Sequence, residues 1–255
     1  MSLRVAAVQH DIVWESPSTN FGHLEPRIDQ AVGAGAELVV LSEMYSTGFT
    51  MNSAEMAEDL AGPSTEFLAQ QAARHRVWVT GSIPIRWPDG VAYNTLTLTG
   101  PLGELHRYRK IHPFTYSSEP ENYGAGTDFL SVEVKGVRCT FFVCYDLRFA
   151  DEFWATARVT DLFVIPANWP ERRRTHWRSL LHARAIENQA YVMGVNRVGE
   201  GDGLAYAGDS MIIDPWGEVL ASGAGGEVLL VADVDAGVVA DTRAAFPVFA
   251  DRRTG

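Results

Sequence analysis

Glu43, Lys110 and Cys144 each stand at or just beyond the end of a predicted strand. The carboxyl ends of strands are where open α/β sheets bind their ligands, so one sheet edge could bring this carboxylate, ammonium and thiol together. The three groups would supply a proton acceptor, a positive charge and a nucleophile, which are the groups that acyl transfer uses. The spacing therefore points to a cysteine-dependent reaction at an acyl carbon.

Taken singly, each of these residues has a simpler explanation. A free cysteine is more often a small buried hydrophobic side chain, and a lone glutamate or lysine is more often solvated. Cys144 differs because it stands between a strand and a predicted helix, where free amides and a nearby cation would lower the pKa of the thiol toward neutrality. Cys139 keeps the simpler interpretation, and its spacing from Cys144 makes a disulfide between them implausible.

Other catalytic signatures are absent from the sequence. There is no G-x-S-x-G elbow, no P-loop, no complete dinucleotide fingerprint and no H-E-x-x-H pair. The 7 histidines are scattered, and His176 and His182 would lie on different faces of one helix. We therefore expect neither a metal nor a cofactor.

The elements that must position these residues alternate between strands and helices. We predict strands at 3–9, 37–41, 77–83, 92–99, 104–109, 129–134, 137–144, 161–165, 191–195, 209–214, 218–221 and 227–234. Helices are predicted from a cap at Asn20, from Pro63, after Cys144 as far as Arg158, and over 173–189, with none after residue 195. The polar and aromatic segment 111–127 is long enough to be a functional loop or lid. Without linkers or repeats, the chain is predicted to be a single domain, 1–255.

The charge balance excludes some classes of partner. Lys and Arg number 21 against 32 Asp and Glu, so the net charge is −11. Nucleic acids and anionic membranes need a basic face, so neither is an expected partner. No apolar run approaches the ~18 residues of a spanning helix, and we expect a soluble, cytoplasmic protein.

Three segments, 41–49, 107–112 and 143–149, resemble the catalytic blocks of the nitrilase superfamily of carbon-nitrogen hydrolases, in that family's order. Further stretches that resemble the family are 166–170, 183–189, 194–199, 208–210 and 214–217. Within the superfamily, 166–170 with its tryptophan and 194–199 are most similar to the bacterial ω-amidase branch.

The resemblance implies an α/β fold, a four-layer α-β-β-α sandwich of two mixed sheets, that pairs into a homodimer or higher homo-oligomer. It also implies a Glu-Lys-Cys triad, whose roles fall on Glu43, Lys110 and Cys144. A second glutamate that supports the lysine and orients substrate falls on Glu119, with Glu121 as the competing candidate.

The ω-amidase resemblance implies that the substrate is a short dicarboxylate mono-amide, of the 2-oxoglutaramate or 2-oxosuccinamate type, with water as acyl acceptor. Lys110 and the backbone N–H of Tyr145 are the expected oxyanion partners. Trp169 and Tyr45 are candidates for the pocket wall, although core packing is the commoner role of a lone Trp.

The distal carboxylate of such a substrate needs a cation or a nest of amides. Four arginines are available, Arg148, Arg172, Arg173 and Arg174. The simpler interpretation is a structural ion pair for Arg148 and solvation of a helix start for the other three.

Two alternatives stay open. The first keeps the triad and changes the substrate or acceptor, giving a nitrilase, an N-carbamoyl hydrolase or an acyl transferase. The second is a non-catalytic protein in which Cys144 is a redox-sensing thiol.

Overall fold

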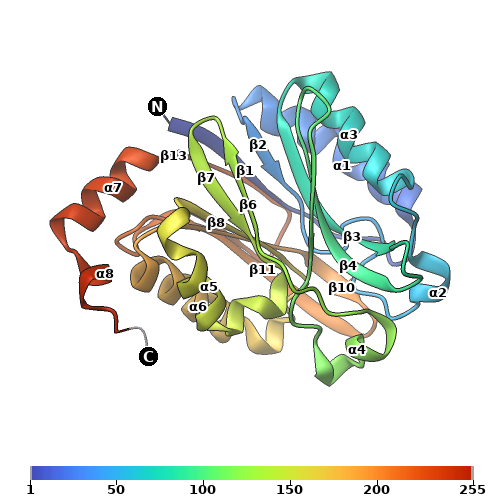
Figure 1. Ribbon diagram of the computed structural model, residues 1–255. Helices are drawn as coiled ribbons and strands as arrows, with labels where there is room; N and C mark the ends of the chain where they lie inside the picture. The colour runs from blue at the N-terminus through green and yellow to red at the C-terminus, as the bar shows by residue number, and fades with distance from the viewer. Residues whose placement is uncertain (1, 254–255) are drawn as a thin grey trace.

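Two mixed β-sheets lie at the centre of the computed structural model, which describes residues 2–253 (Figure 1). From edge to edge, the strands of the six-stranded sheet are β13 (Val228–Asp235), β1 (Ser2–Gln9), β2 (Leu38–Val40), β3 (Trp78–Arg86), β4 (Ala92–Thr99) and β5 (Leu105–Arg109). The seven-stranded sheet has the order β10 (Val198–Gly201), β11 (Leu204–Ile213), β9 (Tyr191–Asn196), β8 (Leu162–Ala167), β7 (Val137–Phe141) and β6 (Leu130–Val134), with β12 (Val219–Ala224) also paired to β11.

Helices cover the outer faces of both sheets. The α-helices are α1 (Pro17–Gly33), α2 (Ser53–Met56), α3 (Pro63–His75), α4 (Glu119–Asn122), α5 (Ala150–Thr156), α6 (Arg174–Asn188), α7 (Ala236–Ala245) and α8 (Val248–Asp251). The short 3-10 helices are η1 (Thr115–Ser117), η2 (Cys144–Arg148), η3 (Ala157–Val159) and η4 (Glu171–Arg173). In Figure 1, α1 and α3 lie on one side of the paired sheets and α5 and α6 on the other. The layers therefore follow the predicted α-β-β-α order.

Strand β1 explains why its sequence lacks an alternating pattern. Leu3 and Val5 point into the core between the two sheets, where they join Phe141 of the opposite sheet. Ala6 and Val8 point the other way and pack in the cluster under α1 and α3. A strand buried on both faces has no polar side, so its sequence is a continuous apolar run.

The central strands of each sheet are parallel. In the first sheet β1 pairs with β2 and β2 with β3 in parallel, and in the second sheet β7 pairs with β8 and β8 with β9 in the same way. Antiparallel strands flank both groups. Because parallel strands end at the same sheet edge, the segments after β2 and β7 can meet across the sandwich.

The structure corrects several boundaries expected from sequence. Helix α1 begins at Pro17, and Asn20 is a buried helical residue whose side chain bonds to Val13 and to the carbonyl of Ser46 rather than an N-cap. Strand β7 ends at Phe141, before Cys144. Strand β10 and helices α2, α4, α7 and α8 were not anticipated, because most of them are very short and α7 has weak periodicity.

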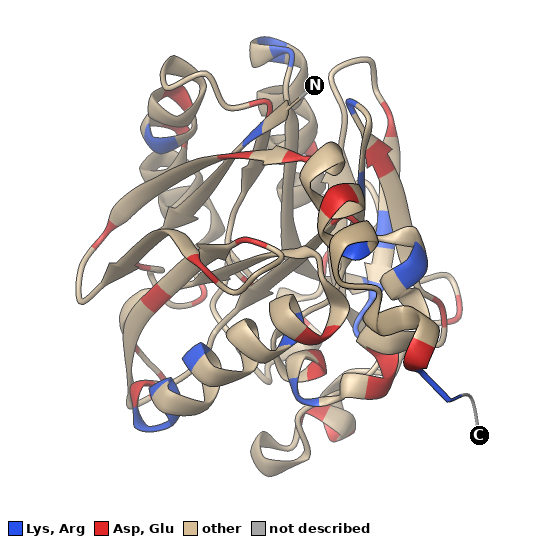
Figure 2. Ribbon diagram, turned by 90° about the vertical axis from the view of Figure 1, so that its left-hand side faces the viewer, with Lys and Arg blue, Asp and Glu red and all other residues tan. Residues whose placement is uncertain are grey.

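Acidic and basic residues are interspersed over the ribbon in the view of Figure 2. Among residues 2–253, no helix has the length and apolar character needed to cross a membrane.

Candidate active site

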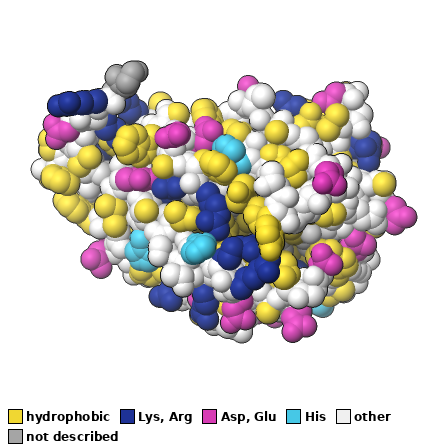
Figure 3. All heavy atoms as spheres, turned by 90° about the horizontal axis from the view of Figure 1, so that it is seen from below, with side chains coloured by type: hydrophobic (Ala, Val, Ile, Leu, Met, Phe, Trp, Pro, Cys, Tyr) yellow, Lys and Arg dark blue, Asp and Glu magenta, His cyan; other side chains and the backbone are white. Residues whose placement is uncertain are grey.

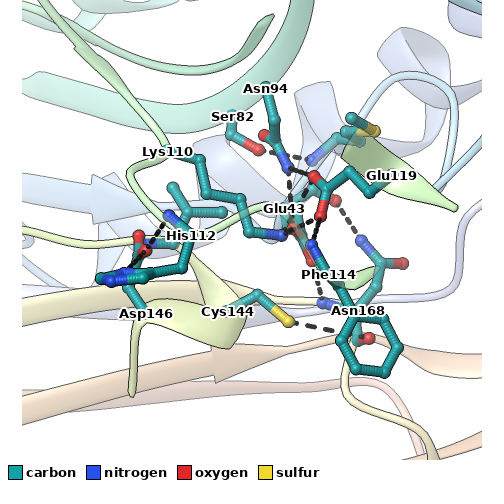
Figure 4. Close-up of polar contacts among 12 residues, drawn as sticks. Glu43, Ser82, Asn94, Lys110, His112, Phe114, Glu119, Cys144, Asp146 and Asn168 are labelled. Carbon is teal, nitrogen blue, oxygen red and sulfur yellow. Dashed lines mark hydrogen bonds and ion pairs between the residues drawn. The ribbon is translucent and has the colours of Figure 1, made fainter. Parts of the chain in front are cut away.

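A buried ion cluster joins Glu43, Lys110 and Glu119 (Figure 4). Glu43 follows β2, Lys110 follows β5 and Glu119 begins α4. The Lys110 Nζ lies 3.0 Å from Glu43 Oε1 and 2.8 Å from Glu119 Oε2. All three side chains are buried, so their charges interact with little screening by water. The structure thus brings together Glu43, Lys110 and Glu119, with Cys144 beside them, and favours Glu119 over Glu121, which is exposed.

Two asparagines complete the hydrogen bonding of these carboxylates. Asn94 of β4 donates from Nδ2 to Glu43 Oε1 at 2.8 Å and to Glu119 Oε1 at 3.2 Å. The backbone N–H of Asn168 donates to the other oxygen of Glu43 at 2.8 Å. Sequence reasoning missed Asn94, which stands in an ordinary strand pattern, and it assigned no role to Asn168 although it marked 166–170.

Cys144 opens the η2 turn just beyond β7, with φ of 46°. A non-glycine residue in this left-handed region is uncommon and marks a sharply turned backbone. Its thiol lies 3.9 Å from the carbonyl oxygen of Asn168 and close enough to the Glu43 carboxylate for that charge to act on it. Figure 4 shows the sulfur beside the Glu43–Lys110 cluster.

The protonation of Cys144 differs from the expectation. Burial, and then the negative charge of Glu43, raise the pKa of the thiol well above its usual value, and the opposing effect of Lys110 is smaller. The predicted lowering toward neutrality is therefore wrong. The carboxylate and the desolvated setting outweigh the cation and the amides at the turn, so the free thiol is protonated at neutral pH.

Asp146 connects the turn that carries Cys144 to the segment that carries Lys110. Its carboxylate accepts hydrogen bonds from the Tyr108 hydroxyl at 2.8 Å and from the backbone N–H of His112 at 2.9 Å. It also accepts one from the backbone N–H of Val143 at 2.9 Å. One buried carboxylate thus fixes the turn that carries Cys144 relative to the end of β5.

The thiol of Cys144 opens into a cavity of about 210 Å³. Trp169, a candidate for the pocket wall, lines it, and so does Tyr145, whose backbone N–H is the expected oxyanion partner. Its other lining residues are Phe49, Met51, Phe114, Tyr116, Ser117, Arg148, Asn168, Pro170, Arg172, Arg173, Asp202, Leu204 and Tyr206. A group of basic side chains bordered by hydrophobic ones lies on the face of the molecule seen in Figure 3.

Tyr45 does not line this cavity. Its ring packs with Phe21 and Phe67 in the core beneath the outer helices, and its hydroxyl donates to the carbonyl of Ser64 at 2.6 Å. Its aromatic side chain made Tyr45 a candidate for the pocket wall, and this expectation is wrong. The chain turns after Glu43, so Tyr45 points to the opposite side of the sheet.

Arg148, Arg172 and Arg173 reach the cavity, whereas Arg174 does not. The Arg148 guanidinium lies 4.7 Å above the Trp169 ring. Among residues 2–253 it has no carboxylate partner, which corrects its interpretation as a structural ion pair. Arg174 instead forms a bidentate salt bridge with Asp209, in which Nε and Nη2 donate to the two carboxylate oxygens at 2.8 and 2.9 Å.

The chain resembles characterised proteins along nearly its whole length. The sequence model of the carbon-nitrogen hydrolase family matches residues 4–244. An omega-amidase YafV from Yersinia enterocolitica is 39% identical, covering 98% of this chain and 96% of the relative. A 2-oxoglutaramate amidase from Bacillus subtilis is 36% identical, covering 99% and 98%. The crystal structure of XC1258 from Xanthomonas campestris, a CN-hydrolase superfamily protein with an arsenic adduct in the active site, superposes with a TM-score of 0.94 at 35% identity, covering 100% of this chain and 98% of the other.

Proposed function

The chain belongs to the carbon-nitrogen hydrolase family, and from this premise we propose that it is an ω-amidase that hydrolyses a short dicarboxylate mono-amide to the acid and ammonia. One observation carries the proposal. The Cys144 thiol, beside Glu43 and Lys110, faces a small cavity, and three arginines border this cavity. The thiol and carboxylate fit attack on an amide, and the arginines fit a substrate with a carboxylate at its far end.

In the proposed reaction, Cys144 Sγ attacks the amide carbon while its proton passes to Glu43. Lys110 Nζ and the Tyr145 N–H stabilise the oxyanion of the tetrahedral intermediate. Glu43 then returns the proton to the leaving nitrogen, the carbon–nitrogen bond breaks, and ammonia departs from the thioester.

Water completes the proposed cycle. Glu43 takes a proton from water, whose oxygen adds to the thioester carbon, and the carbon–sulfur bond breaks as the proton returns to sulfur. The raised pKa of the Cys144 thiol supports the role of Glu43, because a protonated thiol needs a base within reach. Glu119 supports the cation in this scheme, since it lies on the other side of Lys110.

Arg148 is the arginine we propose for the substrate carboxylate. It stacks on Trp169 in the cavity wall and has no carboxylate partner among the described residues. A guanidinium can bind a carboxylate through two parallel hydrogen bonds. Because the net charge is −11, attraction of an acidic substrate depends on local cations.

The test is ammonia release from a panel: 2-oxoglutaramate, 2-oxosuccinamate, glutaramate, the neutral propionamide and a short nitrile, each with the Cys144→Ala variant as control. We expect hydrolysis of the carboxylate-bearing amides and loss of that activity in the variant. Turnover confined to the nitrile would replace the ω-amidase proposal with another reaction of the same triad. Full activity of the Cys144→Ala variant would contradict the assignment of Cys144 as the nucleophile.

The redox-thiol alternative predicts different chemistry. A sensor cysteine is an accessible thiolate with a lowered pKa. Burial raises the pKa of Cys144, which favours the hydrolase.

We also propose that the chain, as a single domain over 1–255, forms a homodimer in the cytoplasm. Trp154 of α5 and Ile186 of α6 are large apolar side chains that are about half exposed. This exposure supports the proposal that a second copy of the chain packs against this helical face. Light scattering after gel filtration tests this; a monomer at micromolar concentration would contradict it. The free thiols of Cys139 and Cys144 agree with a reducing compartment.

A further inference from the structure

Tyr206 presents an unused hydrogen-bonding group to the cavity. Leu204 and Tyr206 are two residues apart on β11, so their side chains share one face of the strand, and both line the cavity. Asp202, in the turn before β11, also lines it. Tyr206 is only 6% exposed. Among residues 2–253, nothing forms a hydrogen bond with its hydroxyl, so this group is available to water or to a ligand in the cavity.

Arg197 holds the ring of Tyr206 in place. Its guanidinium lies 4.6 Å from the ring centroid and is itself fully buried. Arg197 donates to Asp11 Oδ1 at 2.7 Å and to the carbonyl of Ile12 at 3.1 Å. It also donates to the carbonyls of Val198 at 3.0 Å and Glu200 at 2.9 Å. The position of the Tyr206 ring is therefore fixed from behind, which preorganises its hydroxyl.

The Tyr206 side chain shares the cavity with the Cys144 thiol and with the guanidinium groups of Arg148 and Arg173. It is within electrostatic range of Glu43, of Cys144 and of Arg173. Burial raises the pKa of Tyr206 to about 12, so the hydroxyl keeps its proton at neutral pH and can donate it. A ligand group between the reacting amide and the arginines would meet this donor.

We propose that Tyr206 determines specificity by donating a hydrogen bond to the 2-oxo oxygen of a 2-oxo dicarboxylate mono-amide. The inference rests on the proposed function. With its amide at Cys144 and its carboxylate at Arg148, such a substrate has one polar group between the two ends, and that group is an acceptor. Substrates with an apolar carbon at this position lack this hydrogen bond and gain nothing from the hydroxyl.

The charges around Tyr206 favour an oxo group over an amino group. The cavity lining carries three guanidinium groups, of Arg148, Arg172 and Arg173, against the single carboxylate of Asp202, so an ammonium at the same carbon would meet a net positive charge. Like charges in a partly desolvated cavity repel each other. The site therefore selects 2-oxo acid amides and discriminates against 2-amino acid amides such as glutamine.

The experiment compares two enzymes with two substrates, so that the loss of the Tyr206 hydroxyl and the loss of the oxo group are measured separately and together. The kcat/KM values of the wild type and Tyr206→Phe are measured with 2-oxoglutaramate and with glutaramate, which lacks the oxo group. Removing the hydroxyl should lower kcat/KM for the oxo substrate about tenfold and change that for glutaramate less than twofold. Phenylalanine keeps the ring against Arg197, so the fold should be retained, as thermal unfolding would verify.

Tyr191→Phe is the matched control, because it removes a buried tyrosine hydroxyl from β9 outside the cavity lining. It should leave the ratio of the two kcat/KM values unchanged. Equal losses for both substrates in Tyr206→Phe, or no loss, would overturn the role of Tyr206 and leave the proposed function intact. A wild type that releases ammonia from neither substrate would overturn the proposed function itself, and the inference with it.

Discussion

The Nζ of Lys110 lies 2.8 Å from Oε2 of Glu119, and neither side chain is more than 1% exposed. With Glu43 on its other side, the one cation neutralises part of the charge of two buried carboxylates. Burial raises the pKa of Glu119, and Lys110 opposes that rise. The two carboxylates together raise the pKa of Lys110 despite its burial. The ammonium is therefore a permanent positive charge, and the site depends on it for stability as well as for chemistry.

Lys110→Met should destabilise the fold strongly. Removing one partner of a buried ion pair leaves uncompensated charge and typically costs about 3–5 kcal/mol. Lys135 is a matched control, because its pair with Glu37 lies at the surface and Lys135→Met should cost at most about 1 kcal/mol. Urea unfolding measures both. Adding Glu119→Gln to Lys110→Met should recover part of the loss in stability without restoring turnover, and equal costs for the two lysine variants would contradict this account.

Glu119→Gln should lower kcat far more than Glu121→Gln. The amide keeps the shape of the side chain but loses the charge that faces Lys110, and charge-assisted hydrogen bonds contribute about 1.5–3 kcal/mol, or roughly 10- to 100-fold in rate. Glu121 is exposed and two residues away, so its variant should stay within about twofold of the wild type. Steady-state kinetics decide this, and comparable losses in both variants would argue against the assignment of Glu119.

The alkylation of Cys144 should accelerate with pH well into the alkaline range. Burial and Glu43 raise the pKa of the thiol, so its thiolate fraction at pH 7 is small and grows about tenfold per pH unit below that pKa. Iodoacetamide should thus react more slowly at pH 7 than it does with a small free thiol, and the rate should still rise at pH 9. Cys144→Ala supplies the background from the buried Cys139. A rate that levels off below pH 8 would mean that Lys110 already holds a thiolate.

The ends of predicted strands suggested that Glu43, Lys110 and Cys144 could share one sheet edge, because strand patterns are local and parallel strands end at one edge. Their assignment as a triad came from the resemblance to the nitrilase superfamily. Side-chain direction beyond those ends was not predictable. Tyr45 is close to Glu43 in sequence but packs on the opposite side, because the turn between them has no periodicity. Asn94 acquires its role only when the segment that carries Glu119 folds over β4. The sequence of Asn94 and its neighbours holds no sign of that contact.

Gly126 holds the segment 119–126, which carries Glu119, against the end of β5. Its backbone N–H donates to the carbonyl of Lys110 at 2.8 Å, and a Cβ there would lie 2.1 Å from the carbonyl oxygen of Arg109. Gly126→Ala must therefore move the segment away from β5, and we expect a loss of about 1–3 kcal/mol in stability together with reduced kcat as Glu119 shifts from Lys110.

Gly22→Ala provides the opposite case. Gly22 lies inside α1, and a Cβ there has nothing within 4 Å. Alanine should therefore stabilise the helix by about 0.5–1 kcal/mol and leave kcat unchanged. Chemical denaturation and initial rates on both variants test the pair. A Gly126→Ala protein with the stability and kcat of Gly22→Ala would mean that the segment tolerates displacement, and that Glu119 reaches Lys110 without the contact between Gly126 and β5.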